Sequence, residues 1–153
     1  MGASGIVAND LQQKLHRIGL VSFAFTDPHQ GLVSAALLDS RDVAIAISHS
    51  GTTTDTIEIL SAAKRHGATT VAITNSPRSP LASLADHVLT TAAMETTFRA
   101  ASTGSRLAQL TVVDALFVGV AQIRFEESIS ALDETRKVVT VKRVDGGDHD
   151  RLD

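Results

Sequence analysis

Val43-Ala-Ile-Ala-Ile47 runs directly into Ser48-His-Ser-Gly-Thr-Thr-Thr-Asp-Thr56, and this junction decides the fold. The first run is short, apolar and rich in β-branched residues, which is typical of a strand buried on both faces. After the polar stretch, Ile57 to Arg65 has the spacing of an amphipathic helix. The sequence therefore predicts a strand, a hydroxyl-rich turn and a helix start in immediate succession.

The polar stretch has the composition of an anion site. It holds six serine or threonine residues in nine positions, around Gly51. A helix start offers free backbone N–H groups and the positive end of the helix dipole. Together with hydroxyl groups, these donors can hold a phosphate without a lysine. A tight turn with an ordinary N-cap and no ligand is the alternative, but the density of hydroxyl groups favours a phosphoester site.

Strands and helices alternate along the rest of the chain. Asp27 is predicted to cap a helix whose first residue is Pro28. This alternation is typical of a three-layer α-β-α sandwich around a parallel sheet, whose ligands bind beyond the carboxyl ends of the strands. The further predicted strands are 20–25, 69–74 and 86–90, and the further predicted helices are 6–17, 28–38, 81–85, 98–125 and 129–141. Residues 1–141 would form one domain, followed by a disordered polar tail at 142–153.

Composition excludes several classes of function. The 153-residue chain has a net charge of −3, no cysteine, and neither Trp nor Tyr. It therefore lacks the basic and aromatic surfaces that bind nucleic acid, and it can form no disulfide or thiolate site. Its six histidines show no paired metal-ligand spacing, so we expect no metal and no cofactor. We find no apolar run near the roughly 18–20 residues that span a membrane, and no signal peptide, so we expect a cytoplasmic protein.

Two loops and two helices carry a resemblance to a known family. Ser48-His-Ser-Gly-Thr-Thr53 resembles the phosphosugar loop of the SIS (sugar isomerase) domain family, and Gly2-Ala-Ser4 resembles that family's first glycine-serine loop. Gly2-Ala-Ser-Gly-Ile-Val-Ala8 with Leu11-Gln-Gln-Lys-Leu15, and Leu107-Ala-Gln-Leu-Thr-Val-Val-Asp-Ala-Leu-Phe-Val-Gly119, resemble the ligand-binding half of MurR/RpiR-type transcription regulators.

The resemblance implies a five-stranded parallel flavodoxin-like sheet and a homodimer, or a higher homo-oligomer, with helices at the interface. DNA would be bound only through a helix-turn-helix domain, which this chain lacks. The family's first strand, which lies in the middle of the sheet, is also missing from the chain. We therefore expect either a truncated gene product or a partner strand that fills the gap in the sheet.

The resemblance also implies a set of ligand residues. Ser48, Ser50 and Thr53 would hold the phosphate of a sugar phosphate, and Ser4 would hold the phosphate or the adjoining sugar. The backbone amides of His49, Gly51 and Thr52 would complete the site, with the ring of His49 pointing to solvent. Glu95, in the loop before the predicted helix 98–125, could reach a sugar hydroxyl.

Catalysis would need a further group. Aldose–ketose isomerisation requires a base beside the sugar carbons, and SIS isomerases carry it on or near the helix after the last strand. This chain has no carboxylate between Glu95 and Asp114. Our first interpretation is therefore a non-catalytic phosphosugar sensor domain of an RpiR-type transcription regulator. The alternatives are a SIS-type phosphosugar isomerase, and a remnant that does not fold stably because its first strand is missing.

Overall fold

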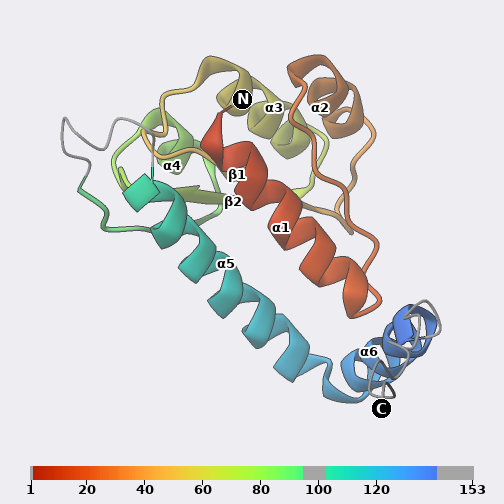
Figure 1. The fold of residues 1–153 in the computed structure, drawn as a ribbon. Helices are drawn as coiled ribbons and strands as arrows, with labels where there is room; N and C mark the ends of the chain where they lie inside the picture. Colours follow the sequence, from red (N-terminus) through yellow and green to blue (C-terminus); the bar gives the residue numbers. More distant parts are fainter. Residues whose placement is uncertain (1, 95–102, 141–153) are drawn as a thin grey trace, which may run out of the picture.

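The computed structural model describes residues 2–94 and 103–140, in which three parallel strands form one sheet (Figure 1). The strands β1 (Val43–Ile47), β2 (Thr69–Thr74) and β3 (His87–Thr90) lie in the order β1-β2-β3. Parallel neighbours need a crossover connection. Helix α3 (Thr54–Arg65) connects β1 to β2, and the short helix α4 (Pro80–Leu84) lies between β2 and β3 in the chain.

Helices cover both faces of this sheet. Side chains alternate along a strand, so Ile47 and Ile73 face one layer while Ala46 and Ala72 face the other. The isoleucines pack against Val7 of α1 (Ala3–Arg17) and Val113 of α5 (Thr103–Ile123), two helices that lie side by side (Figure 1). The alanines face α3 and α4, and α2 (Pro28–Ala35) packs on α3. The predicted three-layer α-β-α sandwich is confirmed.

The predicted strand at 20–25 is wrong. These residues belong to no strand, and the side chains of Val21 and Phe23 are 81% and 76% exposed. A strand needs a hydrogen-bonded neighbour, and no strand in residues 2–94 or 103–140 pairs with this segment. The sheet in residues 2–94 and 103–140 has three strands, not the five that the family resemblance implied, and β1 lies at its edge.

Most predicted helices are present with shifted ends. Asp27 caps α2 by accepting a hydrogen bond from the Gln30 amide at 2.8 Å, and Pro28 occupies the first helical position, as predicted. Helix α2 ends at Ala35 and α3 begins at Thr54. The last helix, α6 (Phe125–Thr140), begins four residues before the predicted 129. Part of the predicted helix 98–125 and the predicted tail at 142–153 lie outside the described residues.

Helix α5 corrects the expectation that no segment could span a membrane. By length and composition alone it is long and apolar enough to do so. In this structure one side of α5 packs on α1, and Lys14 of α1 pairs with Asp114 of α5. Opposite the buried Gln109 and Val113, Leu107 and Val118 are 60% and 49% exposed, and Asp114 lies between them on the same face. Helix α5 thus exposes large apolar side chains on a face that also carries Asp114.

Candidate functional site

The hydroxyl-rich turn lies at the carboxyl end of β1 and leads directly into α3. Ser48 is buried, and its Oγ accepts a hydrogen bond from the Gly51 amide at 3.1 Å and lies 3.1 Å from Thr53 Oγ1. Ser50 is exposed, and its Oγ accepts from the Thr52 amide at 3.3 Å and lies 2.9 Å from Thr52 Oγ1. The two serine oxygens therefore occupy the acceptor positions of two turn amides. A phosphate oxygen is a stronger acceptor because it is charged, so it could take these donors.

Gly51 holds this turn against the loop that follows β2. Its φ of +67° is in the left-handed region that favours glycine. A Cβ on Gly51 would lie 2.1 Å from Ser79 Oγ, so only glycine fits here without displacing Ser79. The Gly51 carbonyl accepts from the Leu81 amide at 3.1 Å, and the His49 carbonyl accepts from the Asn75 amide at 3.0 Å. The two loops are therefore joined by backbone hydrogen bonds.

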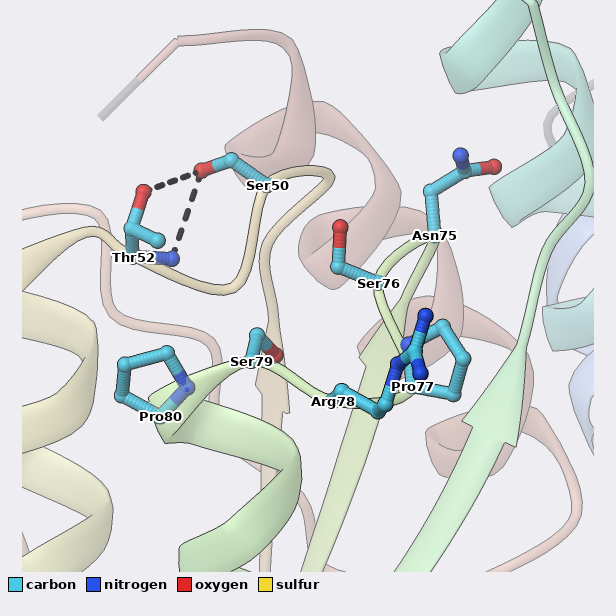
Figure 2. A pocket seen from close by; sticks show the side chains of 8 residues that line it. All are labelled: Ser50, Thr52, Asn75, Ser76, Pro77, Arg78, Ser79 and Pro80. Carbon is cyan, nitrogen blue, oxygen red and sulfur yellow. Dashed lines mark hydrogen bonds between the residues drawn. The ribbon is translucent and has the colours of Figure 1, made fainter.

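A pocket of about 430 Å³ opens between these two loops (Figure 2). Ser50 and Thr52 lie on one side of it, and Asn75 and Ser76 lie on the other. Its volume is within the range of small-molecule sites, and Arg78 supplies a positive charge that suits an anion. The lining residues are Ser50, Thr52, Asn75, Ser76, Pro77, Arg78, Ser79 and Pro80. Residues 75–79 were not among the predicted ligand residues, although this loop follows the neighbouring strand and so lies at the same edge of the sheet.

Ser4 lies in the first turn of α1, and its side chain is half-buried. One turn later, Val7 packs in the same apolar cluster as Ile47, the residue before Ser48. This packing brings the start of α1 to the end of the sheet where the hydroxyl-rich turn lies. The Ser4 hydroxyl donates a hydrogen bond to Oε1 of Gln109, at 3.4 Å. Gln109 was not predicted, because its contact with Ser4 depends on how α1 and α5 pack.

Three predicted residues need separate comment. The ring of His49 does not point freely to solvent as expected, because its Nδ1 is buried and has no hydrogen-bond partner within the described part of the chain. Thr53 is the N-cap of α3, but its side chain does not cap a first-turn amide. Glu95 lies outside the described residues. Within residues 2–94 and 103–140, no three His, Cys, Asp or Glu side chains gather as a metal-ligand group.

Comparison with known sequences identifies one family and several relatives to which this chain is similar. The SIS domain family matches residues 1–119. The HTH-type transcriptional regulator YbbH of Bacillus subtilis is 41% identical over 145 residues, which are 94% of this chain and 51% of YbbH. The HTH-type transcriptional regulator RpiR of Escherichia coli K12 is 38% identical over 138 residues, covering 90% of this chain and 47% of RpiR. The chain thus spans about half the length of these curated relatives.

Solved structures give the same assignment. Vibrio vulnificus NanR complexed with ManNAc-6P has a TM-score of 0.86 and 30% identity, covering 95% of this chain and 55% of NanR. The sugar isomerase domain of an RpiR transcription factor from Sphaerobacter thermophilus has a TM-score of 0.78 and 29% identity, over 90% of this chain and 75% of that one. A protein named as a candidate phosphosugar isomerase, from Bacteroides fragilis, has a TM-score of 0.75 and 27% identity, over 88% and 71%. From its match over residues 1–119 and these structural relatives, the chain belongs to the SIS domain family.

Proposed function

We propose that this chain is the phosphosugar-binding sensor domain of an RpiR-type transcription regulator, in which a helix-turn-helix domain outside these residues binds DNA. The observation that carries the proposal is the turn Ser48–Thr53, where two serine hydroxyls accept from turn amides beside a pocket lined by Arg78. NanR, which is 30% identical, is in complex with a sugar phosphate, and the curated relatives are named as transcriptional regulators. Such regulators act on DNA, so we place the protein in the cytoplasm.

In the proposed complex, the phosphate accepts hydrogen bonds from the hydroxyls of the turn and of Ser4. The hydroxyl donors in the turn are Ser48, Ser50 and Thr53, and the amide donors are His49, Gly51 and Thr52. Glu95 contacts a sugar hydroxyl, and no side chain acts as a catalytic group. Because Ser4 is on α1, the ligand would tie this helix to the carboxyl end of β1. A ligand can regulate the protein only if it binds one arrangement of the protein more tightly than another. Helices α1 and α5 pack on each other, so a ligand that contacts Ser4 on α1 would affect how this pair is arranged.

The exposed side of α5 favours a homodimer. Leu107 and Val118 are eleven residues apart, about three helical turns, so they lie on the same face of α5. That face is turned away from the buried residues Gln109 and Val113. Asp114, which lies between the two exposed residues, pairs with Lys14 of α1, so the exposed apolar part of this face is Leu107 and Val118. Burial of these two side chains against another surface would be favourable. A second copy of the chain is the occupant we propose, and insertion into a membrane is the outcome that would contradict it.

The test of the proposed function is calorimetric titration of the 153-residue chain with a panel of pentose, hexose and amino-sugar phosphates that includes ManNAc-6P. We expect saturable binding of at least one member and weaker binding by Ser50→Ala. Ser40→Ala is the matched control, because Ser40 is an exposed serine near the amino end of β1, at the opposite end of the strand from the turn. The absence of heat with every ester, from protein that melts cooperatively, would overturn the proposal.

A phosphosugar isomerase is the second candidate. It is favoured by the 27% identity with the Bacteroides fragilis protein, and it is opposed by the lack of a carboxylate between Glu95 and Asp114. An aldose–ketose interconversion assay on the same panel separates the two functions. If the chain interconverts one of these esters and Glu95→Gln abolishes that activity, the protein is an enzyme and the sensor interpretation is wrong.

A further inference from the structure

The contact between Ser4 and Gln109 joins the start of α1 to α5 over 105 positions of sequence. Gln109 is 1% exposed, which is unusual for a glutamine. Its Oε1 accepts the Ser4 hydroxyl, while its Nε2 is buried and has no hydrogen-bond partner in the part of the chain that the structure describes. A buried amide with unpaired N–H groups is a costly arrangement, so it calls for a physical reason.

The surrounding packing prevents this amide from moving away. Val113, one turn after Gln109, and Val7, one turn after Ser4, are both fully buried in one apolar cluster. Further along the two helices, Lys14 pairs with Asp114. Helices α1 and α5 are therefore held side by side (Figure 1). Rotation of the amide about its last side-chain bond remains available, and it exchanges oxygen for nitrogen at nearly the same position.

The two orientations give Ser4 different hydrogen-bonding roles. A serine hydroxyl has one proton. With Gln109 Oε1 facing it, Ser4 donates that proton to Gln109, so the hydroxyl can only accept from a ligand. With Nε2 facing it, Gln109 donates to Ser4, and the Ser4 proton is available to a phosphate oxygen. The distance of 3.4 Å is long for a hydroxyl hydrogen bond, so the first arrangement is a weak one.

We propose that Gln109 is a positioning residue for the phosphosugar site, whose amide orientation determines whether Ser4 can donate to the phosphate. The proposal rests on the proposed function, because it assumes that Ser4 contacts the ligand. In the bound state the hydrogen bonds run from Gln109 Nε2 to Ser4 Oγ and from Ser4 to the phosphate, and each strengthens the next. One buried N–H group of Gln109 thereby gains the partner that it lacks in the structure.

A double-mutant cycle tests this assignment. We would titrate wild type, Gln109→Met, Ser4→Ala and the double variant with inorganic phosphate and with ManNAc-6P. Methionine keeps the length of glutamine but cannot donate, so we expect Kd to rise about tenfold, the order of one charge-assisted hydrogen bond. In the Ser4→Ala background the same change should have no effect, because Gln109 acts through Ser4. Unchanged affinity of Gln109→Met, or a full additional loss in the Ser4→Ala background, would overturn the assignment.

Gln109→Glu provides a second readout and covers the case in which the methionine variant does not fold. A buried carboxyl group has a raised pKa, and only its protonated form can donate to Ser4. The ratio of the variant's Kd to that of wild type should therefore fall as the pH is lowered from 8 to 5, with the titration of phosphate cancelled in the ratio. A ratio independent of pH contradicts the positioning role. If wild type binds neither probe nor any ester of the panel, both the proposed function and this inference are wrong. If wild type binds and the Gln109 variants bind equally well, only this inference is wrong.

Discussion

Gly51 lies so close to Ser79 that a Cβ on Gly51 would stand 2.1 Å from Ser79 Oγ and 2.5 Å from Ser79 Cβ. We therefore expect Gly51→Ala to lower the free energy of unfolding by about 3 kcal/mol. A left-handed backbone costs a residue with a Cβ about 1–2 kcal/mol, and overpacking adds about 1–3 kcal/mol. Urea unfolding measures the change. Gly119→Ala is the matched control: no atom lies within 4 Å of its added Cβ, so it should be neutral or stabilising. Equal effects of the two substitutions would contradict the close approach.

Substitutions of the two serines of the turn should differ in their effect on stability but have a similar effect on ligand binding. Ser48 is buried and satisfies the Gly51 amide, so Ser48→Ala leaves a donor unpaired and should cost about 1–3 kcal/mol of stability. Ser50 is exposed, so Ser50→Ala should change stability by no more than about 0.5 kcal/mol. Both should weaken phosphosugar binding by about 1.5–3 kcal/mol. Thermal melts and calorimetry measure the two quantities, and a Ser50→Ala protein that melts much earlier than wild type would contradict this division.

From the contacts of Asp86 we predict a contribution to folding stability that is lost in acid. Lys64 donates to its carboxylate at 2.8 Å, and the hydroxyl and amide of Thr70 donate at 2.7 and 2.9 Å. These contacts, with Lys64 first, hold the pKa of Asp86 well below its ordinary value of 3.8. A lowered folded-state pKa means that the contribution is complete above about pH 4 and is lost as the pH falls below 3.8 towards the folded value.

The comparison of wild type with Asp86→Asn measures this contribution. We expect the variant to be less stable at pH 7 and the difference in unfolding free energy to shrink between pH 4 and pH 2. Asp133→Asn, an exposed position on α6 outside this network, is the control and should track wild type throughout. A deficit for Asp86→Asn that stays constant down to pH 2 would show that its charge is not the cause.

The proposed dimer makes a prediction about the outer face of α5. Two further negative charges beside Asp114 should prevent association, so the double variant Leu107→Glu, Val118→Glu should be monomeric in sedimentation velocity while wild type is dimeric. Leu37→Glu, at another apolar position that is 82% exposed, should leave the dimer intact. A wild-type chain that is monomeric, or that partitions into lipid vesicles, would contradict this use of the face.

The parts of the fold that depend on local sequence were predictable. Strands β1 and β2 have the predicted bounds, because a short β-branched run between polar turns has few alternatives. Asp27 and Pro28 marked the start of α2 correctly, because capping depends only on neighbours in the chain. Residues 20–25 failed for the opposite reason. Their short apolar run with two phenylalanines suits a strand, but whether a strand forms depends on a neighbour elsewhere in the chain.

The same distinction between local sequence and distant packing applies to the candidate site. The turn at Ser48–Thr53 could be identified from composition, since its hydroxyls and its glycine are contiguous. Gln109 could not, because it stands in an apolar helical stretch and its partner is 105 residues away. Arg78 was not predicted because the loop after β2 carries no run of hydroxyl residues around a glycine, although its position at the end of a neighbouring strand places it at the same pocket. The predicted contact of Glu95 remains a prediction.

The outer side of β1 has a consequence for handling the protein. No strand of the described residues covers that side, so its backbone N–H and C=O groups are available to an extended peptide, and Val43 beside them is 58% exposed. Exposed edge strands of this kind pair with strands of other chains and promote aggregation. Concentrated samples of these 153 residues should therefore tend to precipitate by strand addition, and a lysine at Val43 would be the simplest way to keep them in solution.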